Sequence, residues 1–108
     1  MKWYKIFGSL QEAEAGIPQN AARLIVIRNQ QICLARTNSA FFAIDNACPH
    51  MKEALHKGLI NHNGEITCPL HEYRYKLSNG EECQSRTRAA KTFNVKTNEH
   101  GLYIGVSD

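Results

Sequence analysis

Four side chains of the kinds that commonly bind metals occur as two short pairs near the middle of the chain. Cys48-Pro49-His50 is a C-x-H pair and Cys68-Pro69-Leu70-His71 is a C-x-x-H pair, with seventeen residues between them. Thiolate and imidazole are ligands of zinc sites and of iron–sulfur centres, and two short loops can converge on one site. The pattern therefore predicts a metal centre to which each loop supplies one sulfur and one nitrogen.

A proline follows each cysteine and limits the backbone around it. Proline fixes its own φ, has no N–H, and favours an extended conformation in the residue before it. We therefore expect rigid turns at Pro49 and Pro69 that hold the two cysteines in place. Cysteines of a core and histidines of a surface can fall together by chance, but the repetition of the pair, each time with Cys-Pro, favours a ligand set.

The segments that must position these pairs are short strands separated by turns. Residues 22–28, 31–37 and 40–45 are rich in Ile, Val, Leu and Phe and are joined by polar turns, which predicts an antiparallel meander. Further strands are expected at 65–67, 73–77, 92–95 and 102–106, the last two as a closing hairpin. Only residues 11–15 and 52–55 suggest a helical turn. The sequence thus predicts one all-β domain, an antiparallel sandwich or small barrel.

The spacing of the two pairs resembles that of Rieske-type [2Fe–2S] proteins, and specifically of small soluble Rieske ferredoxins. The resemblance covers the whole chain, 1–108, and implies a two-loop cluster-binding subdomain at about residues 46–78. By this resemblance, one [2Fe–2S] cluster has an inner iron held by Cys48 and Cys68 and an outer iron held by His50 and His71. Neutral imidazoles in place of two thiolates leave the oxidised centre less negative, which raises the potential from about −400 mV to roughly −150 to +300 mV.

The same resemblance implies a one-electron carrier rather than an enzyme. Its expected partners are a flavin-containing reductase, which supplies electrons, and a terminal oxygenase, which receives them. Rieske oxygenases also carry a mononuclear iron site of two histidines and a carboxylate. After His71 this chain has only His100, so we expect no catalytic residues here.

Some positions near the ligand pairs depart from related patterns. Respiratory members carry an extra cysteine in each loop where this chain has Glu53 and Leu70, so a soluble ferredoxin is favoured. Many relatives have glycine where this chain has Lys52 and Glu72, which predicts less open loops at both places. Tyr75 is expected either to donate a hydrogen bond to the Cys68 sulfur or to be an ordinary core aromatic.

The remaining cysteines and histidines have simpler interpretations. Cys33 lies in an apolar predicted strand, so we expect its thiol to be buried and inert. We expect the thiol of Cys83 to lie in a loop. A disulfide between them is conceivable but disfavoured in a reducing compartment. We expect the other three histidines on the surface: His56, His62 and His100. Of these, only His56 is near enough in the sequence to approach the cluster loops.

Composition excludes several classes of function. The longest aliphatic run, Leu24-Ile25-Val26-Ile27, is far shorter than the ~18–20 apolar residues of a membrane span. Thirteen basic and ten acidic residues give a net charge of +3, and no basic run indicates nucleic-acid binding. The start of the chain lacks a signal-peptide core, so the expected location is the cytoplasm. The expected state is a monomer or weak oligomer.

Two other functions satisfy parts of the pattern. The small subunit of an assimilatory nitrite reductase has a related domain, but many members lack the four ligands that this chain has. A structural zinc site in an interaction module also uses two cysteines and two histidines. Common zinc fingers place both cysteines first, whereas the order here is Cys, His, Cys, His. Visible colour distinguishes the two metals, because a zinc protein is colourless.

Overall fold

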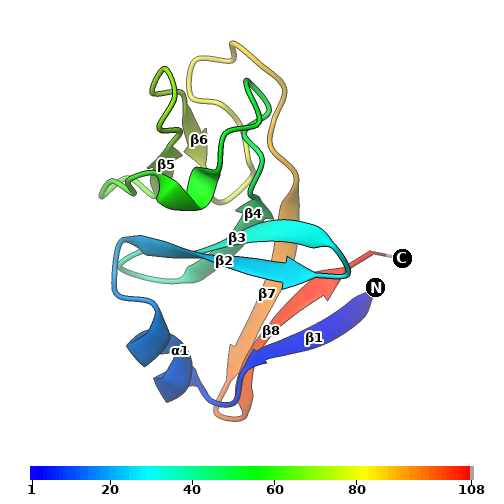
Figure 1. The fold of residues 1–108 in the computed structure, drawn as a ribbon. Coiled ribbons are helices and arrows are strands. Elements are labelled where there is room, and N and C mark those ends of the chain that lie inside the picture. Colours follow the sequence, from blue (N-terminus) through cyan, green and yellow to red (C-terminus); the bar gives the residue numbers. More distant parts are fainter. Residues whose placement is uncertain (108) are drawn as a thin grey trace.

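The computed structural model, which describes residues 1–107, consists mainly of antiparallel strands (Figure 1). The elements in chain order are β1 (Lys2–Phe7), α1 (Leu10–Gly16), β2 (Ala21–Ile27), β3 (Gln30–Arg36), β4 (Phe41–Asp45), the 3-10 turn η1 (Leu55–Lys57), β5 (Glu65–Thr67), β6 (Arg74–Lys76), β7 (Thr92–Asn98) and β8 (Gly101–Val106). Six strands form one sheet in the order β1-β8-β7-β4-β3-β2, and β5 pairs with β6 separately.

The large sheet curls so that its two halves face each other across a core. In Figure 1 the β2–β3–β4 half lies across the β1–β8–β7 half, and α1 lies at the lower end. The core between the halves contains Ile32 and Leu34 of β3 together with Leu102 and Ile104 of β8. The predicted all-β antiparallel fold is therefore confirmed, and its curled sheet forms the base of the molecule.

Strand β3 separates two cores, which explains its uninterrupted apolar sequence. Side chains alternate along a strand. Ile32 and Leu34 face the core of the base, while Cys33 and Ala35 belong to a second core beneath the β5–β6 hairpin. A strand buried on both faces reads as continuously hydrophobic, and it joins the two parts of the molecule rigidly.

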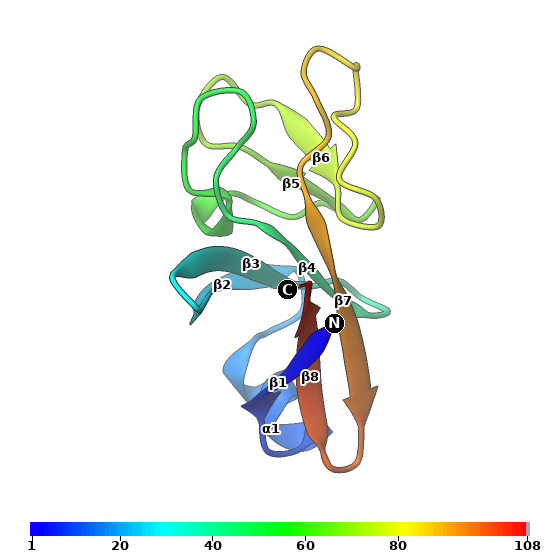
Figure 2. The same cartoon turned by 90° about the vertical axis from the view of Figure 1, so that its right-hand side faces the viewer.

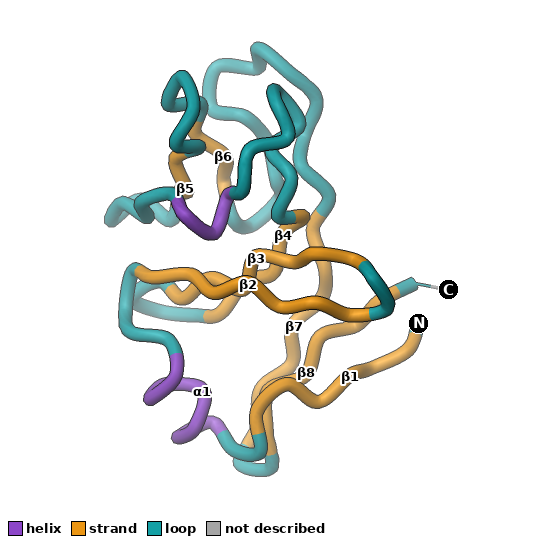
Figure 3. Tube along the Cα trace, in the orientation of Figure 1, coloured by secondary structure: helices purple, strands orange, loops and turns teal. Residues whose placement is uncertain are grey.

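The second part of the molecule consists of η1, the β5–β6 hairpin and three long loops above the base. Figures 2 and 3 show these loops grouped at the end of the molecule opposite α1. Turns with positive φ at Gly64 and Gly80 follow asparagines and end two of the chain reversals. Because β5 and β6 have three residues each, most of this part depends on loop contacts for its shape.

Most of the expected strands are present with ends within one to three residues of those predicted. The meander β2–β3–β4 and the β7–β8 hairpin are confirmed. The helical turn predicted at 11–15 is α1, whereas the turn predicted at 52–55 lies later, at η1. Strand β1 was not expected; it pairs with β8 from Lys2↔Val106 onward. Among the described residues, no helix has the length and hydrophobicity to span a membrane.

Candidate metal centre

The first ligand loop connects β4 to η1 and is closed by backbone hydrogen bonds. The Cys48 N–H donates to the Glu53 carbonyl at 2.9 Å, and the Lys52 N–H donates to the Cys48 carbonyl at 2.6 Å. The base of the loop is held by a bridge between Ala47 and Ala54. These contacts fold residues 47–54 back on themselves, so that the Cys48 side chain points into the protein and is fully buried.

The second ligand loop connects β5 to β6 and repeats this closure. The Cys68 N–H donates to the Tyr73 carbonyl at 2.7 Å, five residues further on, as Cys48 does to Glu53. The segment between η1 and β5 lies against the start of this loop, where the Thr67 N–H donates to the Leu59 carbonyl at 2.8 Å. Gly58 makes this approach possible, because a Cβ built on it would lie 1.8 Å from the Thr67 carbonyl oxygen.

The two loops bring all four predicted donors together as a sulfur pair and an imidazole pair. Cys48 and Cys68 are both fully buried in the second core, and they are near enough for Cys48 to raise the pKa of Cys68. The rings of His50 and His71 lie 5.1 Å apart at 54°. His50 is partly buried and His71 is exposed. The sulfurs thus lie inside and the imidazoles outside.

Burial dominates the electrostatics of the Cys68 thiol. It raises the pKa of the Cys68 thiol to about 11, against the lowering effect of a hydrogen bond from the backbone of Leu70. A neutral thiol is therefore favoured at this position unless a cation stabilises the thiolate. Coordination to a metal ion deprotonates a thiol outright, so the buried pair is suited to a bound metal.

The imidazole pair also has a nitrogen atom that is free to bind a metal. Nδ1 of His50 is buried and has no hydrogen-bond partner among residues 1–107, a rare condition for a buried polar atom. A hollow of about 440 Å³ lies against the other ring, lined in part by Leu59, Pro69 and His71. Within the described chain, no three His, Cys, Asp or Glu side chains gather closely enough to hold a single metal ion. Two sulfur and two nitrogen donors in separate pairs are the ligands of a mixed-ligand iron–sulfur centre.

Tyr75 reaches the site from β6, but its partner differs from the one expected. Its hydroxyl lies 3.1 Å from Sγ of Cys48, not of Cys68. The ring is fully buried in the second core, so the residue packs and also contacts a sulfur. Burial and then the contact with Cys48 raise the pKa of the Tyr75 hydroxyl. Tyr75 is thus both a core aromatic and a partner of a cysteine sulfur, and the predicted partner Cys68 is replaced by Cys48.

Tyr73 contributes to the site in a way that the sequence did not suggest. Its ring stacks on the His50 ring with centroids 3.8 Å apart and planes at 12°. The outer face of Tyr73 carries the Arg86 guanidinium at 3.8 Å from the ring centre. Alternation along the strand places Tyr73 and Tyr75 on one face, but nothing in the sequence indicated which residue would cover that face.

The loop positions where relatives often have glycine are unusual in their backbone. Lys52 and Glu72 have φ of 60° and 58°, in the left-handed region that glycine enters without steric cost. His71 shares this conformation at φ 63°. The backbone at both positions therefore has the conformation that glycine favours, although each residue carries a side chain; the expectation of less open loops stays a prediction.

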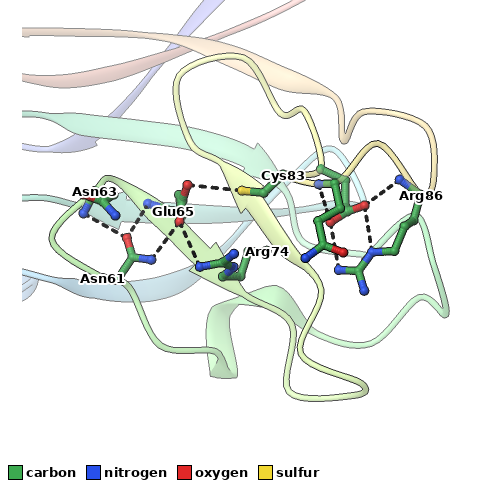
Figure 4. Close-up of polar contacts among 8 residues, drawn as sticks. Asn61, Asn63, Glu65, Arg74, Cys83 and Arg86 are labelled. Carbon is green, nitrogen blue, oxygen red and sulfur yellow. Dashed lines mark hydrogen bonds and ion pairs between the residues drawn. The ribbon is translucent and has the colours of Figure 1, made fainter.

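The other cysteines and histidines lie where the sequence placed them, outside the donor group. Cys33 is buried, and burial raises its pKa to about 12. The Cys83 thiol donates to Glu65 at 3.2 Å (Figure 4), so both cysteines are free and no disulfide joins them. His56 approaches the loops only through Asn46, whose side-chain oxygen contacts its backbone N–H and Nδ1. His62 and His100 are exposed.

Comparison with known proteins gives a family for the sequence. The chain matches the family described as a Rieske-like [2Fe-2S] domain over residues 8–105. It is 30% identical over 93 residues to the 3-phenylpropionate/cinnamic acid dioxygenase ferredoxin subunit of Photorhabdus laumondii, covering 85% of this chain and 88% of the relative.

Two solved structures have the same fold at low identity. The ferredoxin of carbazole 1,9a-dioxygenase from Nocardioides aromaticivorans superposes with a TM-score of 0.84 at 16% identity, covering 99% of this chain and all of that one. A putative NADH-dependent nitrite reductase small subunit from Mycobacterium tuberculosis has a TM-score of 0.84 at 11% identity, covering 99% and 97%. The fold alone therefore does not separate these two functions.

Proposed function

The chain belongs to the family of Rieske-like [2Fe–2S] domains and is a Rieske-type ferredoxin with one [2Fe–2S] cluster, and we propose that Cys48, His50, Cys68 and His71 hold that cluster. The observation that carries the proposal is the pairing of the donors. Two buried sulfurs lie in the same core on the inside, and two neighbouring imidazoles lie outside. The orphaned Nδ1 of His50 fits the same role, because a metal would satisfy it.

When bound, such a cluster takes up and releases one electron at a potential that mixed ligation raises above that of an all-cysteine ferredoxin. The chain's own residues insulate one side of the site and open the other. Leu55, Ile66 and Tyr75 are fully buried around the sulfurs and exclude water there. His71 is exposed beside the hollow that Leu59 and Pro69 line. We infer that electrons enter and leave at the histidine side.

The proposed partners are proteins. Relatives are ferredoxin components of oxygenase systems, among them the dioxygenase ferredoxin subunit that is 30% identical to this chain. We propose that this ferredoxin accepts an electron from a flavin-containing reductase and passes it to a terminal oxygenase. We further propose that it has no catalysis of its own, because its relatives are the ferredoxin components of such systems.

The remaining assignments belong to the same proposal. One domain over residues 1–108, with the ligand loops at about 46–78, is supported by the family match over 8–105. A location in the cytoplasm is supported by four free cysteines, which are typical of reducing compartments. We propose a monomer or weak oligomer that binds neither nucleic acid nor membrane, consistent with the modest charge of +3.

A nitrite reductase small subunit remains the second candidate because its fold is shared. Many members of that group lack the cluster ligands, whereas all four are present and grouped here. The two functions differ in what accepts the electron. A carrier of the proposed kind supports turnover by an oxygenase and does not need a nitrite reductase as its partner.

Spectroscopy of aerobically purified protein tests the cluster assignment. We expect a red-brown protein with two irons and two acid-labile sulfides per chain and a rhombic electron-spin resonance signal after dithionite reduction. His71→Ala is expected to lose iron and sulfide, while His62→Ala, at an exposed position outside the site, keeps both. A colourless protein that contains zinc, or a His71→Ala variant with full iron and sulfide, contradicts the proposal.

Electron transfer tests the role of the protein. Reduced protein mixed with a terminal oxygenase and its substrate should be reoxidised in step with product formation, and a flavin-containing reductase with NADH should reduce it again. No reoxidation by any oxygenase tested, together with turnover of a nitrite reductase that depends on this chain, favours the second candidate instead.

A further inference from the structure

A stack of three planar groups leads from the ligand His50 to the surface. The Tyr73 ring lies 3.8 Å from the His50 ring, and the Arg86 guanidinium lies 3.8 Å from the Tyr73 ring on its other side. Arg86 belongs to the long loop between β6 and β7, which lies at the same end of the molecule as the two ligand loops in Figures 1 and 2. A unit positive charge is therefore held two ring spacings from a cluster ligand.

Buried Glu82 fixes the position of this charge. Its two carboxylate oxygens accept from Nε and Nη2 of Arg86 at 3.1 and 2.9 Å, a bidentate pair (Figure 4). The Glu82 side chain is 0% exposed and the Arg86 side chain 38%. The carboxylate also accepts from the backbone N–H groups of Gln84 and Arg86, at 3.1 and 2.6 Å. A bridge to Tyr75 ties Glu82 to β6, so the ion pair is part of the scaffold.

We propose that the positive charge of Arg86 raises the reduction potential at the His50 side of the cluster. Glu82 serves this role by holding Arg86 against the Tyr73 ring. This inference rests on the proposed function. Uptake of an electron adds one negative charge at the site, and a nearby guanidinium stabilises that charge. Glu82 opposes the effect, because its negative charge disfavours the reduced state. The two residues of one ion pair thus act on the potential with opposite signs.

Opposite signs distinguish this role from a merely structural one. Loss of either partner loosens the loop in the same way, so a structural role moves the potential in one direction for both variants. An electrostatic role moves it downward for Arg86→Gln and upward for Glu82→Gln. A partly screened unit charge changes the equilibrium constant for reduction roughly 3- to 10-fold. That change is about 30–60 mV for one electron.

The experiment is redox titration of the cluster-loaded protein, followed by visible circular dichroism. Arg86→Gln should lower the midpoint potential and Glu82→Gln should raise it. Arg88→Gln and Glu81→Gln are the matched controls, because both residues are exposed and lie in the same stretch of chain, and each variant changes the net charge equally. Arg88 donates to the carbonyl of its neighbour Ala89, not to a buried carboxylate. Arg86→Lys, which keeps the charge, should restore part of the wild-type potential.

The inference is overturned if Arg86→Gln shifts the potential no more than Arg88→Gln, or if the Arg86 and Glu82 variants shift it in the same direction. Where Glu82→Gln fails to fold, the comparison of Arg86→Gln with Arg88→Gln decides alone. Iron and sulfide are measured in each sample. Their absence from the wild-type protein contradicts the proposed function, whereas a loaded protein with unchanged potentials contradicts only the role of Arg86.

Discussion

The hydroxyl of Tyr75 lies 3.1 Å from Sγ of Cys48, and neither side chain is exposed. The sulfur of a ligand cysteine is ionised, so the hydroxyl is then the donor. A hydrogen bond to an ionised acceptor is stronger than one between neutral groups, and burial strengthens it further. This contact links β6 to the first ligand loop at one of the four proposed cluster ligands.

Tyr75→Phe is therefore expected to lower the reduction potential. Withdrawal of electron density from the sulfur favours the reduced state, and the loss of one such bond corresponds to about 1 kcal/mol. For a one-electron couple this is roughly 40 mV. Potentiometry of the loaded protein measures it, with Tyr103→Phe on β8 as the control. An unchanged potential leaves Tyr75 with a packing role only.

The sequence was sufficient to predict most strands and to single out the four proposed donors, because both depend on local patterns. Cys-Pro followed by histidine recurs in two loops, and apolar runs between turn residues predicted β2, β3 and β4. Strand β1 was missed because Lys2 to Phe7 has little alternation, and its pairing with distant β8 decides its structure. Its existence follows from a contact between the two ends of the chain.

The surroundings of the donors were beyond prediction from the sequence for a similar reason. The stack of Arg86 on Tyr73 joins residues from two loops whose relative placement depends on the bridge between Tyr75 and Glu82. The partner of Tyr75 depends on which cysteine the β5–β6 hairpin brings nearer, and spacing along the chain does not contain this information. Left-handed Lys52 and Glu72 show that loop closure outweighs their local preference.

Replacement of Lys52 by glycine is expected to stabilise the protein. At φ 60° a lysine has a steric cost of about 1–2 kcal/mol that glycine lacks, partly offset by the greater entropy of glycine in the unfolded chain. A net gain of about 0.5–1 kcal/mol should raise the thermal midpoint of the loaded protein by a few degrees. Glu72→Gly, at φ 58°, should behave alike.

The control for this prediction is Lys76→Gly, which makes the same change in an exposed strand residue of β6. Glycine within a strand weakens it, so this variant should have a lower thermal midpoint. If Lys52→Gly and Lys76→Gly both destabilise the protein to a similar extent, the left-handed conformation of Lys52 has no measurable cost.

Gly58→Ala is expected to push the segment after η1 away from the start of the second ligand loop. The added methyl group would lie 1.8 Å from the backbone oxygen of Thr67, the residue that precedes Cys68, and a backbone atom cannot turn aside as a side chain can. Overpacking of this kind costs about 1–3 kcal/mol. We expect a lower thermal midpoint and faster loss of visible absorbance in the presence of a chelator.

Gly8→Ala provides the comparison for Gly58→Ala. Its new methyl group would meet only the flexible Glu12 side chain, at 3.2 Å, far along the chain from both loops. This variant should retain its visible absorbance as the wild-type protein does. Equal rates of cluster loss in the two alanine variants argue against close loop contact at Gly58.

Acid should remove the contribution of Glu82 to stability. Hydrogen bonds from the Arg86 side chain are the largest cause that lowers the pKa of the Glu82 carboxyl, from an ordinary 4.5 to about 2. A carboxyl with a lowered pKa in the folded state contributes stability that is fully present above pH 4.5 and is lost as the pH falls toward 2. The difference in unfolding free energy between wild type and Glu82→Gln should therefore shrink across that window. Denaturant unfolding at pH 3 to 6 measures the difference.

The Arg86→Gln background is the control, because the main cause of the lowered pKa is absent there. In that background the effect of Glu82→Gln on the unfolding free energy should depend less on pH. If this effect changes with pH equally in both backgrounds, Arg86 is not the cause of the lowered pKa.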